Sequence, residues 1–258
     1  MNSSSAMLTV NNLTVEYGTF KAVKNISFNV NGGEIFGLLG PNGAGKTSTL
    51  SAIECLLKPQ SGEISIASFN ILKNPLHAKA NMGVQLQSTS FQPELTLIEI
   101  LTLYAGIYGV DLTKEKLKQL LEEIKLEGSY NKKFKELSGG QQQRVSLVIA
   151  TIHNPALVLL DEPTTGLDPQ SRRQLWERIE AIREKGHAVL LTTHSMEEAE
   201  AVCDRIAIMD HGNIITIDAP QALIDQHRND ESVISASRKG KITLEDVFIG
   251  LTGRTVRT

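Results

Sequence analysis

The sequence predicts an α/β protein built mainly around a parallel sheet. In its second half, apolar strands alternate with helices over residues 156–161, 169–185, 188–192, 196–202 and 205–209. This alternation is typical of parallel βαβ units. A helical block at about 93–153 interrupts it, which predicts a separate helical subdomain. With 258 residues, 41% of them hydrophobic, the chain can bury a substantial core.

The first half is expected to place one glycine-rich loop among several strands. Alternating or apolar runs predict strands at 7–17, 26–30, 34–39, 63–67 and 83–86. The loop follows the third of these strands. A helix is expected from 45 to about 57, and Pro59 ends it because proline cannot continue a helix. Farther along, a hairpin is expected around 211–213.

The helical block and the C-terminal tail show their own patterns. Helices are expected at 96–108 and 114–126, the second with an apolar face formed by Leu117, Leu120, Leu121 and Ile124. Residues 228–241 are polar and charged, which predicts a linker. Thr243 and Asp246 have capping-box spacing and open a final amphipathic helix that Gly253 ends. We therefore expect a disordered N-terminus at 1–6, one domain over 7–227, and a linker and helix over 228–258.

Composition limits the classes of function. The net charge of −3 lacks the basic character of a nucleic-acid-binding protein, so no nucleic-acid partner is expected. Cys55 and Cys203 are far apart without metal-like spacing, which favours a reducing cytosol. The N-terminus resembles no signal peptide, and the apolar runs are far shorter than the roughly 20 residues that span a bilayer. Any membrane association should therefore depend on a partner.

The stretch GPNGAGKTS at 40–48 carries the strongest chemical signal. It fits the pattern G-x-x-x-x-G-K-[ST], in which glycines allow backbone N–H groups to surround phosphate oxygens. Lys46 is expected to reach the terminal phosphates, and the Thr47 hydroxyl can hold Mg²⁺. The alternative is an ordinary glycine-rich turn, but the strand before it and the helix after it favour a phosphate site.

Two acidic residues end the apolar strand ALVLLDEP at 156–163. Open α/β sheets bind ligands at the carboxyl ends of their strands. We expect Asp161 to hold Mg²⁺ through its water shell and Glu162 to orient or deprotonate the attacking water. Without the phosphate loop, these residues could equally be a simple strand end.

Three further residues are weaker candidates when taken singly. His194 follows a strand and could bond a phosphate or the attacking water, although a strand-end histidine is more often solvated or capping. Gln87 could contact Mg²⁺ or water but is no signal alone. Tyr17 precedes Gly18 and could stack on adenine, or it could be a half-buried strand-end residue.

A second anion-seeking element occurs at LSGGQ, 137–141. Its glycines open a helix, and a helix N-terminus attracts anions through its unpaired N–H groups and dipole. One bound nucleotide is already contacted by the loop at 40–48. If Ser138 to Gln141 also binds phosphate, a second nucleotide or a second chain is needed.

Taken together, these motifs resemble the ATP-binding cassette (ABC) family from about residue 8 to 218. Tyr17, GPNGAGKTS, Gln87, LSGGQ, LLDEP, GLD at 166–168 and His194 occur in the family's order. The resemblance implies an ABC ATPase fold: a P-loop NTPase core of mainly parallel sheet, an N-terminal antiparallel β subdomain and a helical subdomain. It also implies that Tyr17 stacks on adenine, that Gln87 links the helical subdomain to the core, and that His194 is the switch histidine.

The resemblance assigns ATP and Mg²⁺ as cofactors and gives roles to individual residues. The implied catalytic residues are Glu162, His194, Lys46 and Gln87, and the implied metal ligands are Thr47, Gln87 and Asp161. The implied nucleotide contacts are Tyr17, Gly40, Pro41, Asn42, Gly43, Ala44, Gly45, Lys46, Thr47, Ser48, Ser138, Gly139, Gly140, Gln141 and Asp168. The family further implies a head-to-tail homodimer, in which each LSGGQ covers the ATP held by the other chain's GPNGAGKTS, with Asp168 at the interface.

The chain has one cassette, and only a short segment separates Gln87 from Leu137, so no long coiled coil is inserted. Its end, TLEDVFIGLTGR at 243–254, resembles ATPase subunits of the multidrug-type, ABC-2 exporter group. We therefore expect a Mg-dependent ATPase that powers export through a separate membrane permease, peripheral on the cytoplasmic face of the membrane. The alternative is a soluble ABC-type ATPase that acts on ribosomes or DNA.

Overall fold

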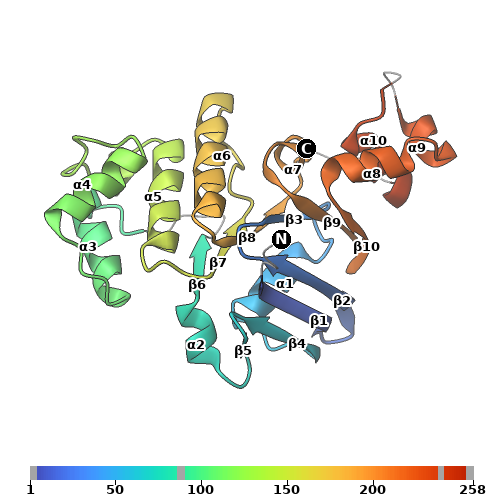
Figure 1. Ribbon diagram of the computed structural model, residues 1–258, viewed down its shortest axis with the longest axis horizontal. Coiled ribbons are helices and arrows are strands. Elements are labelled where there is room, and N and C mark those ends of the chain that lie inside the picture. Colours follow the sequence, from blue (N-terminus) through green and yellow to red (C-terminus); the bar gives the residue numbers. More distant parts are fainter. Residues whose placement is uncertain (1–4, 86–90, 238–240, 254–258) are drawn as a thin grey trace.

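The computed structural model describes residues 5–85, 91–237 and 241–253. Two sheets lie at its centre, flanked by helices (Figure 1). The strands are β1 (Ala6–Tyr17), β2 (Phe20–Asn31), β3 (Ile35–Leu39), β4 (Ser61–Ile66), β5 (Phe69–Asn70), β6 (Met82–Gln85), β7 (Leu157–Asp161), β8 (Ala188–Thr193), β9 (Arg205–Asp210) and β10 (Asn213–Asp218).

The two sheets differ in strand direction. The smaller sheet has the order β2-β1-β4-β5 and is antiparallel. The larger sheet has the order β10-β9-β3-β8-β7-β6; its strands are parallel except that β10 returns antiparallel to β9. The predicted fold class, a mainly parallel sheet with an antiparallel β subdomain and helices, is confirmed.

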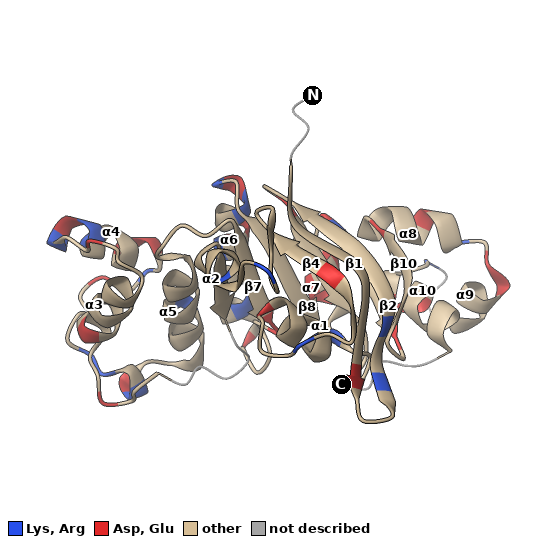
Figure 2. Ribbon diagram, turned by 90° about the horizontal axis from the view of Figure 1, so that it is seen from below, with Lys and Arg blue, Asp and Glu red and all other residues tan. Residues whose placement is uncertain are grey.

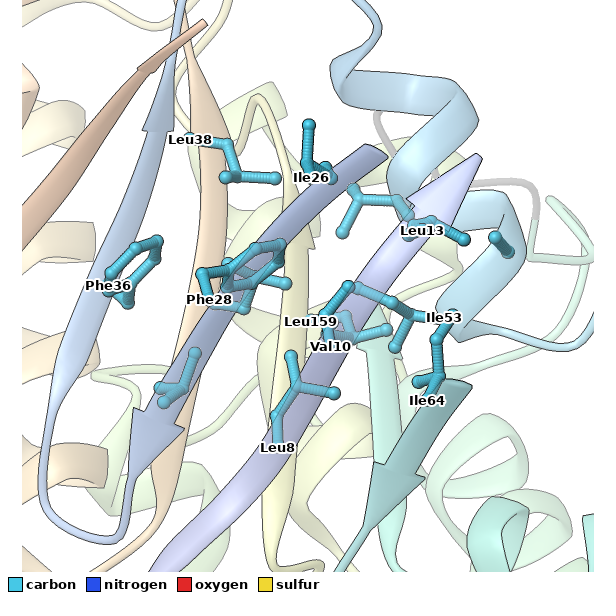
Figure 3. Packing of buried hydrophobic residues seen from close by; sticks show 14 of the residues in the cluster. Leu8, Val10, Leu13, Ile26, Phe28, Phe36, Leu38, Ile53, Ile64 and Leu159 are labelled. Carbon is cyan, nitrogen blue, oxygen red and sulfur yellow. The ribbon is translucent and has the colours of Figure 1, made fainter. Parts of the chain in front are cut away.

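Burial explains the two strand patterns. Every residue of β3 and β8 is buried, because helices and the second sheet cover both faces of the larger sheet. In β1, by contrast, Leu8, Val10, Leu13 and Val15 alternate with more exposed residues. Figure 3 shows β1 side chains meeting Ile53, Ile64 and Leu159, so this core lies between the antiparallel sheet, the helix after the glycine-rich loop and the parallel sheet.

The helices form groups on either side of the sheets. They are α1 (Lys46–Ile53), α2 (Pro75–Ala80), α3 (Leu97–Ile107), α4 (Lys114–Glu123), α5 (Gly139–Thr151), α6 (Pro169–Glu184), α7 (Met196–Val202), α8 (Pro220–His227), α9 (Glu231–Ala236) and α10 (Leu244–Thr252). In Figure 1, α3, α4 and α5 lie at one end of the molecule and α8, α9 and α10 at the other.

The helical block has a core of its own. Leu101, Leu121, Phe134 and Val145 are buried in a cluster that joins α3, α4 and α5. The Lys and Glu residues of α4, coloured in Figure 2, are exposed, whereas its two buried residues, Leu117 and Leu121, belong to the cluster. An amphipathic helix of this kind is stabilised mainly by packing of its apolar face.

One segment differs from expectation. Residues 228–241 were predicted to be a polar linker, yet α9 lies within them. Val233 is fully buried there, and α10 approaches so closely that a Cβ on Gly250 would lie 2.5 Å from a Val233 methyl. One apolar residue thus anchors a helix in a stretch whose average composition is polar. The predicted capping box between Thr243 and Asp246 is present at the start of α10.

Candidate functional site

The site lies where β3, β7 and β8 end. These strands are neighbours in the parallel sheet, and the register pairs Leu39 with Thr193 and Asp161 with Thr192. The loops that follow the three strands therefore begin side by side. Segments that are far apart in the sequence, at 40–48, 161–165 and 193–195, meet at one sheet edge, as expected for a ligand site in an open α/β sheet.

The loop after β3 depends on its glycines. Gly43 and Gly45 have φ of 83° and 106°, a region that other residues rarely adopt. A Cβ on Gly40 would lie 2.4 Å from the Met209 carbonyl oxygen, so that position also requires glycine. The loop ends at α1, whose N-cap residue Gly45 provides no side-chain hydrogen bond and whose first turn has no acidic residue. Its N–H groups therefore suit a bound phosphate.

Lys46 begins α1 and is only 5% exposed. Its Nζ donates to the Gly40 carbonyl at 2.7 Å and to the Pro41 carbonyl at 3.3 Å, and it lies 3.7 Å from Glu162 Oε1. Burial lowers the pKa of Lys46, and the carboxylates of Glu162 and Asp161 oppose that shift. The ammonium group is therefore held over the loop by carbonyls and by the acidic end of β7.

A threonine on β8 orients both acidic residues. The Thr192 hydroxyl donates to Asp161 Oδ1 at 2.5 Å and accepts from the Glu162 N–H at 3.1 Å. Glu162 has φ of 45°, which is unusual for a residue with a side chain. Strain of this kind persists only where the surroundings hold it, and it is common at functional sites. Thr165 donates to Glu162 Oε2 at 3.2 Å.

Glu162 is the point at which the site residues converge. His194 Nδ1 lies 3.2 Å from Glu162 Oε1, the same oxygen that faces Lys46. Glu162 and His194 directly follow β7 and β8, and Lys46 begins the helix after the loop that follows β3. The Glu162 carboxylate is 13% exposed and so remains accessible to a small molecule such as water.

A pocket of about 210 Å³ opens above the loop. It is lined by Tyr17, Phe20, Ala22, Pro41, Asn42, Gly43, Ala44, Gly45, Lys46, Thr47, Ser48 and Glu162. The Tyr17 hydroxyl lies 3.5 Å from Ser48 Oγ, and half of the Tyr17 residue is exposed. Sequence reasoning missed Phe20, which is 65% exposed and pairs with Tyr17 across the β1–β2 turn. A second aromatic residue just after Gly18 was the available signal.

The LSGGQ segment lies elsewhere. Among the residues described as lining the pocket, none comes from 138–141. Ser138 caps α5: the Gln141 N–H donates to Ser138 Oγ at 3.3 Å, and the Ser138 N–H donates to Gln141 Oε1 at 2.9 Å. Ser138 and Gly139 are exposed.

The two glycines of this segment differ. A Cβ on Gly139 would meet no described atom within 4 Å, whereas one on Gly140 would lie 2.6 Å from Ser171 Oγ on α6. Both glycines were expected to allow close approach of a ligand. For Gly140 the missing side chain also allows contact between α5 and α6 inside the chain, and ligand approach at either glycine stays a prediction.

Two other predicted residues have different outcomes. Asp168 caps α6 by accepting from the Gln170 and Ser171 N–H groups, each at 3.0 Å, and from the Ser171 hydroxyl. The Ser171 hydroxyl and N–H lower its pKa. Asp168 is not among the described pocket residues. Gln87 lies outside the described residues.

Residues 23–165 match the model of the ABC transporter family, which is more than half of the chain. The chain belongs to the ABC transporter family. The family match, with the relatives and solved structures below, identifies it as an ATPase subunit of an ABC transporter. A "Nod factor export ATP-binding protein I" of Burkholderia orbicola is 40% identical over 224 residues, which cover 86% of this chain and 74% of that protein. One of the same name from Rhizobium etli is 40% identical over 212 residues, covering 81% and 67%.

Solved structures of the ABC family agree with the fold. An ATP-binding subunit of an ABC transporter superposes with a TM-score of 0.82 at 29% identity, covering 95% of this chain and 99% of that one. A dimeric bacterial ABC transporter cassette gives a TM-score of 0.73 at 29% identity, covering 83% and 98%. In the described part of this ABC chain, no helix is long and apolar enough to cross a membrane.

Proposed function

We propose that this chain is the ATP-hydrolysing subunit of an ABC exporter and that hydrolysis occurs at the pocket beside Glu162. One observation carries the proposal. A single carboxylate oxygen, Glu162 Oε1, lies 3.7 Å from Lys46 Nζ and 3.2 Å from His194 Nδ1, at the edge of a glycine-lined loop. Phosphoryl transfer to water needs a cation for the phosphate and a base for the nucleophile, and this site offers both together.

The roles follow from position. The α1 N-terminus and Lys46 bind the phosphates, and Tyr17 with Phe20 offers an aromatic surface to the base. Glu162 orients and deprotonates the attacking water. His194 lies against the Glu162 carboxylate and can bond the water or the terminal phosphate.

The described residues fit a magnesium ion. They contain no group of three or more His, Cys, Asp or Glu side chains that could form a protein-only metal cage. Mg²⁺ instead retains several waters and takes one or two protein ligands together with substrate phosphates. Thr47, which lines the pocket, and Asp161, fixed by Thr192, are suited to that role. When bound, the ion would neutralise charge that develops on the phosphates.

We further propose that the complete site needs two chains. Ser138 and Gly139 are exposed at the start of α5, with their anion-attracting helix end outside the described pocket lining. A second copy placed head to tail would bring that helix end to the terminal phosphate. The dimeric structure of a related cassette supports the pairing of two chains. Loss of the terminal phosphate would then loosen the dimer.

The export assignment rests on relatives. Proteins about 40% identical are named for the export of Nod factor, and the tail at 243–254 resembles that of ABC-2 exporter ATPases. We propose a separate ABC-2-type permease as partner and a location on the cytoplasmic face of the membrane. The permease would bind the transported substrate.

The test compares wild type with Glu162→Gln, which keeps the shape of the side chain but removes its basicity. Because a positioned base contributes about 10²–10⁴-fold, steady-state ATPase should fall by at least about a hundredfold. The variant should also dimerise in Mg-ATP by light scattering, since ATP is bound but not consumed. Glu177→Gln, at an exposed carboxylate on α6, is the matched control and should behave as wild type.

Wild-type turnover in Glu162→Gln would refute the assignment of Glu162. If the chain co-sediments with ribosomes and does not bind a co-expressed permease, the exporter assignment is wrong and the soluble alternative is favoured.

A further inference from the structure

A buried carboxyl group lies behind the site and has no part in the chemistry proposed above. Glu198, in the first turn of α7, is 1% exposed. Glutamate is almost never fully buried unless it is paired, because removing its charge from water is costly. Burial accordingly raises the pKa of Glu198, while three hydrogen bonds oppose the shift.

The partners of Glu198 come from three different segments. The indole N–H of Trp176, on α6, donates to Glu198 Oε1 at 3.2 Å. The hydroxyls of Thr193 and Thr164 lie beside the carboxyl group and, like the nearby Arg172 charge, lower its pKa. Both threonines are buried, at 2% and 7% exposure, so their hydroxyls have little access to water. The Glu198 carboxyl group thus serves as an acceptor for polar groups of Trp176, Thr193 and Thr164.

Two of these partners adjoin the residues that converge at the site. Thr193 ends β8 and directly precedes His194; its hydroxyl also accepts from the Ser195 N–H at 2.9 Å. Thr164 comes two residues after Glu162, whose φ is 45°. Glu198 therefore connects the chain just before His194 to the chain just after Glu162.

We propose that Glu198 is a positioning residue for ATP hydrolysis, which holds the His194 and Glu162 segments in the relative arrangement that catalysis needs. This inference rests on the proposed hydrolysis at the pocket. Glu198 acts from behind, through Thr193 and Thr164. An error of about 1 Å in the placement of reacting groups can cost about a hundredfold in rate. A residue with this role should control turnover far more than nucleotide affinity. The phosphate-binding loop at 40–48 joins β3 to α1, and Glu198 holds neither of these elements in the proposed role.

The experiment measures kcat, KM for ATP, the Kd of a non-hydrolysable ATP analogue and Tm in wild type, Glu198→Ala and Glu198→Gln. Glu198→Ala should lower kcat by about thirtyfold or more and change KM and Kd by less than about threefold. Glu198→Gln keeps the volume and one acceptor oxygen, so it should recover most of the loss, to within about tenfold of wild type. Glu197→Gln is the matched control: Glu197 is the neighbouring carboxylate on α7, largely exposed and paired with Arg172.

A double-mutant cycle tests the connection to Thr193. Thr193→Val removes the hydroxyl at nearly constant volume and should itself lower kcat. If both residues act through one bond, the double variant with Glu198→Ala should be no slower than Glu198→Ala alone. Additive losses would show independent effects and overturn the inference.

The remaining outcomes also decide the question. A folded Glu198→Ala with kcat within about twofold of wild type overturns the proposal. So does a loss of kcat matched by an equal loss of analogue affinity, which indicates only general loosening. If Glu198→Ala does not fold, Glu198→Gln and Thr193→Val decide: reduced kcat at unchanged Kd supports the role, and wild-type kcat in both refutes it. A wild-type protein without ATPase activity would instead refute the proposed function.

Discussion

Gly83→Ala should destabilise the protein strongly, although it adds a single methyl group. Gly83 lies in β6, the edge strand against which α5 packs, and a Cβ there would lie 1.7 Å from the Ala150 carbonyl oxygen. Ordinary contact begins at 3.4 Å, so α5 and β6 must separate by about 1.7 Å at this point. Neither side is a flexible side chain: one is the backbone of α5, and the other is a strand paired with β7.

The magnitude follows from this geometry. Overpacking costs about 1–3 kcal/mol, and we expect the upper end, about 3 kcal/mol, because the obstacle is backbone. For a chain of this size, each kcal/mol lowers Tm by about 2–4 °C, so Tm should fall by about 6–12 °C. Thermal unfolding followed by circular dichroism measures the shift.

The matched control is Gly106→Ala in α3, where a Cβ meets no described atom within 4 Å and φ is not positive. Alanine favours helix over glycine by up to about 1 kcal/mol, so Tm should stay level or rise slightly. A Tm within about 2 °C of wild type in Gly83→Ala would refute the reasoning, since α5 and β6 would then not be in the close contact described.

Two further predictions concern the site. Ser138→Arg should leave nucleotide binding intact, because Ser138 is outside the described pocket lining, yet lower ATPase activity by about a hundredfold by blocking the second chain. The control is Ser232→Arg, at an exposed serine on α9. Loss of nucleotide binding in Ser138→Arg would contradict the two-chain site. Glu54 is the buried C-cap residue of α1, the helix that follows the phosphate loop. Burial, and then the nearby Asp161 carboxylate, raise the pKa of Glu54 above its ordinary value of 4.5. Ionisation of Glu54 therefore lowers the free energy of unfolding as the pH rises from that value through the folded-state pKa. The Tm advantage of Glu54→Gln over wild type should therefore grow between about pH 4 and pH 8, and a constant difference would contradict it.

Local sequence determined the chemistry and most of the elements. The glycines of 40–45 and the adjacent Lys46 specify a phosphate loop because only glycine permits that backbone. Strand and helix periods, with the capping pair Thr243 and Asp246, located most of the helices and strands to within a few residues. These features depend on neighbours within a few positions, so they can be read without a fold.

Tertiary structure decided which residues meet. Lys46, Glu162 and His194 are distant in sequence and converge only because β3, β7 and β8 are parallel neighbours in register. Gly140 packs on α6, and Glu198 is buried among donors from other segments. Long-range strand order and packing set these contacts, and no short motif encodes them. The LSGGQ segment illustrates both contributions. Its residues predict an anion site, and the structure places that site away from the pocket of its own chain.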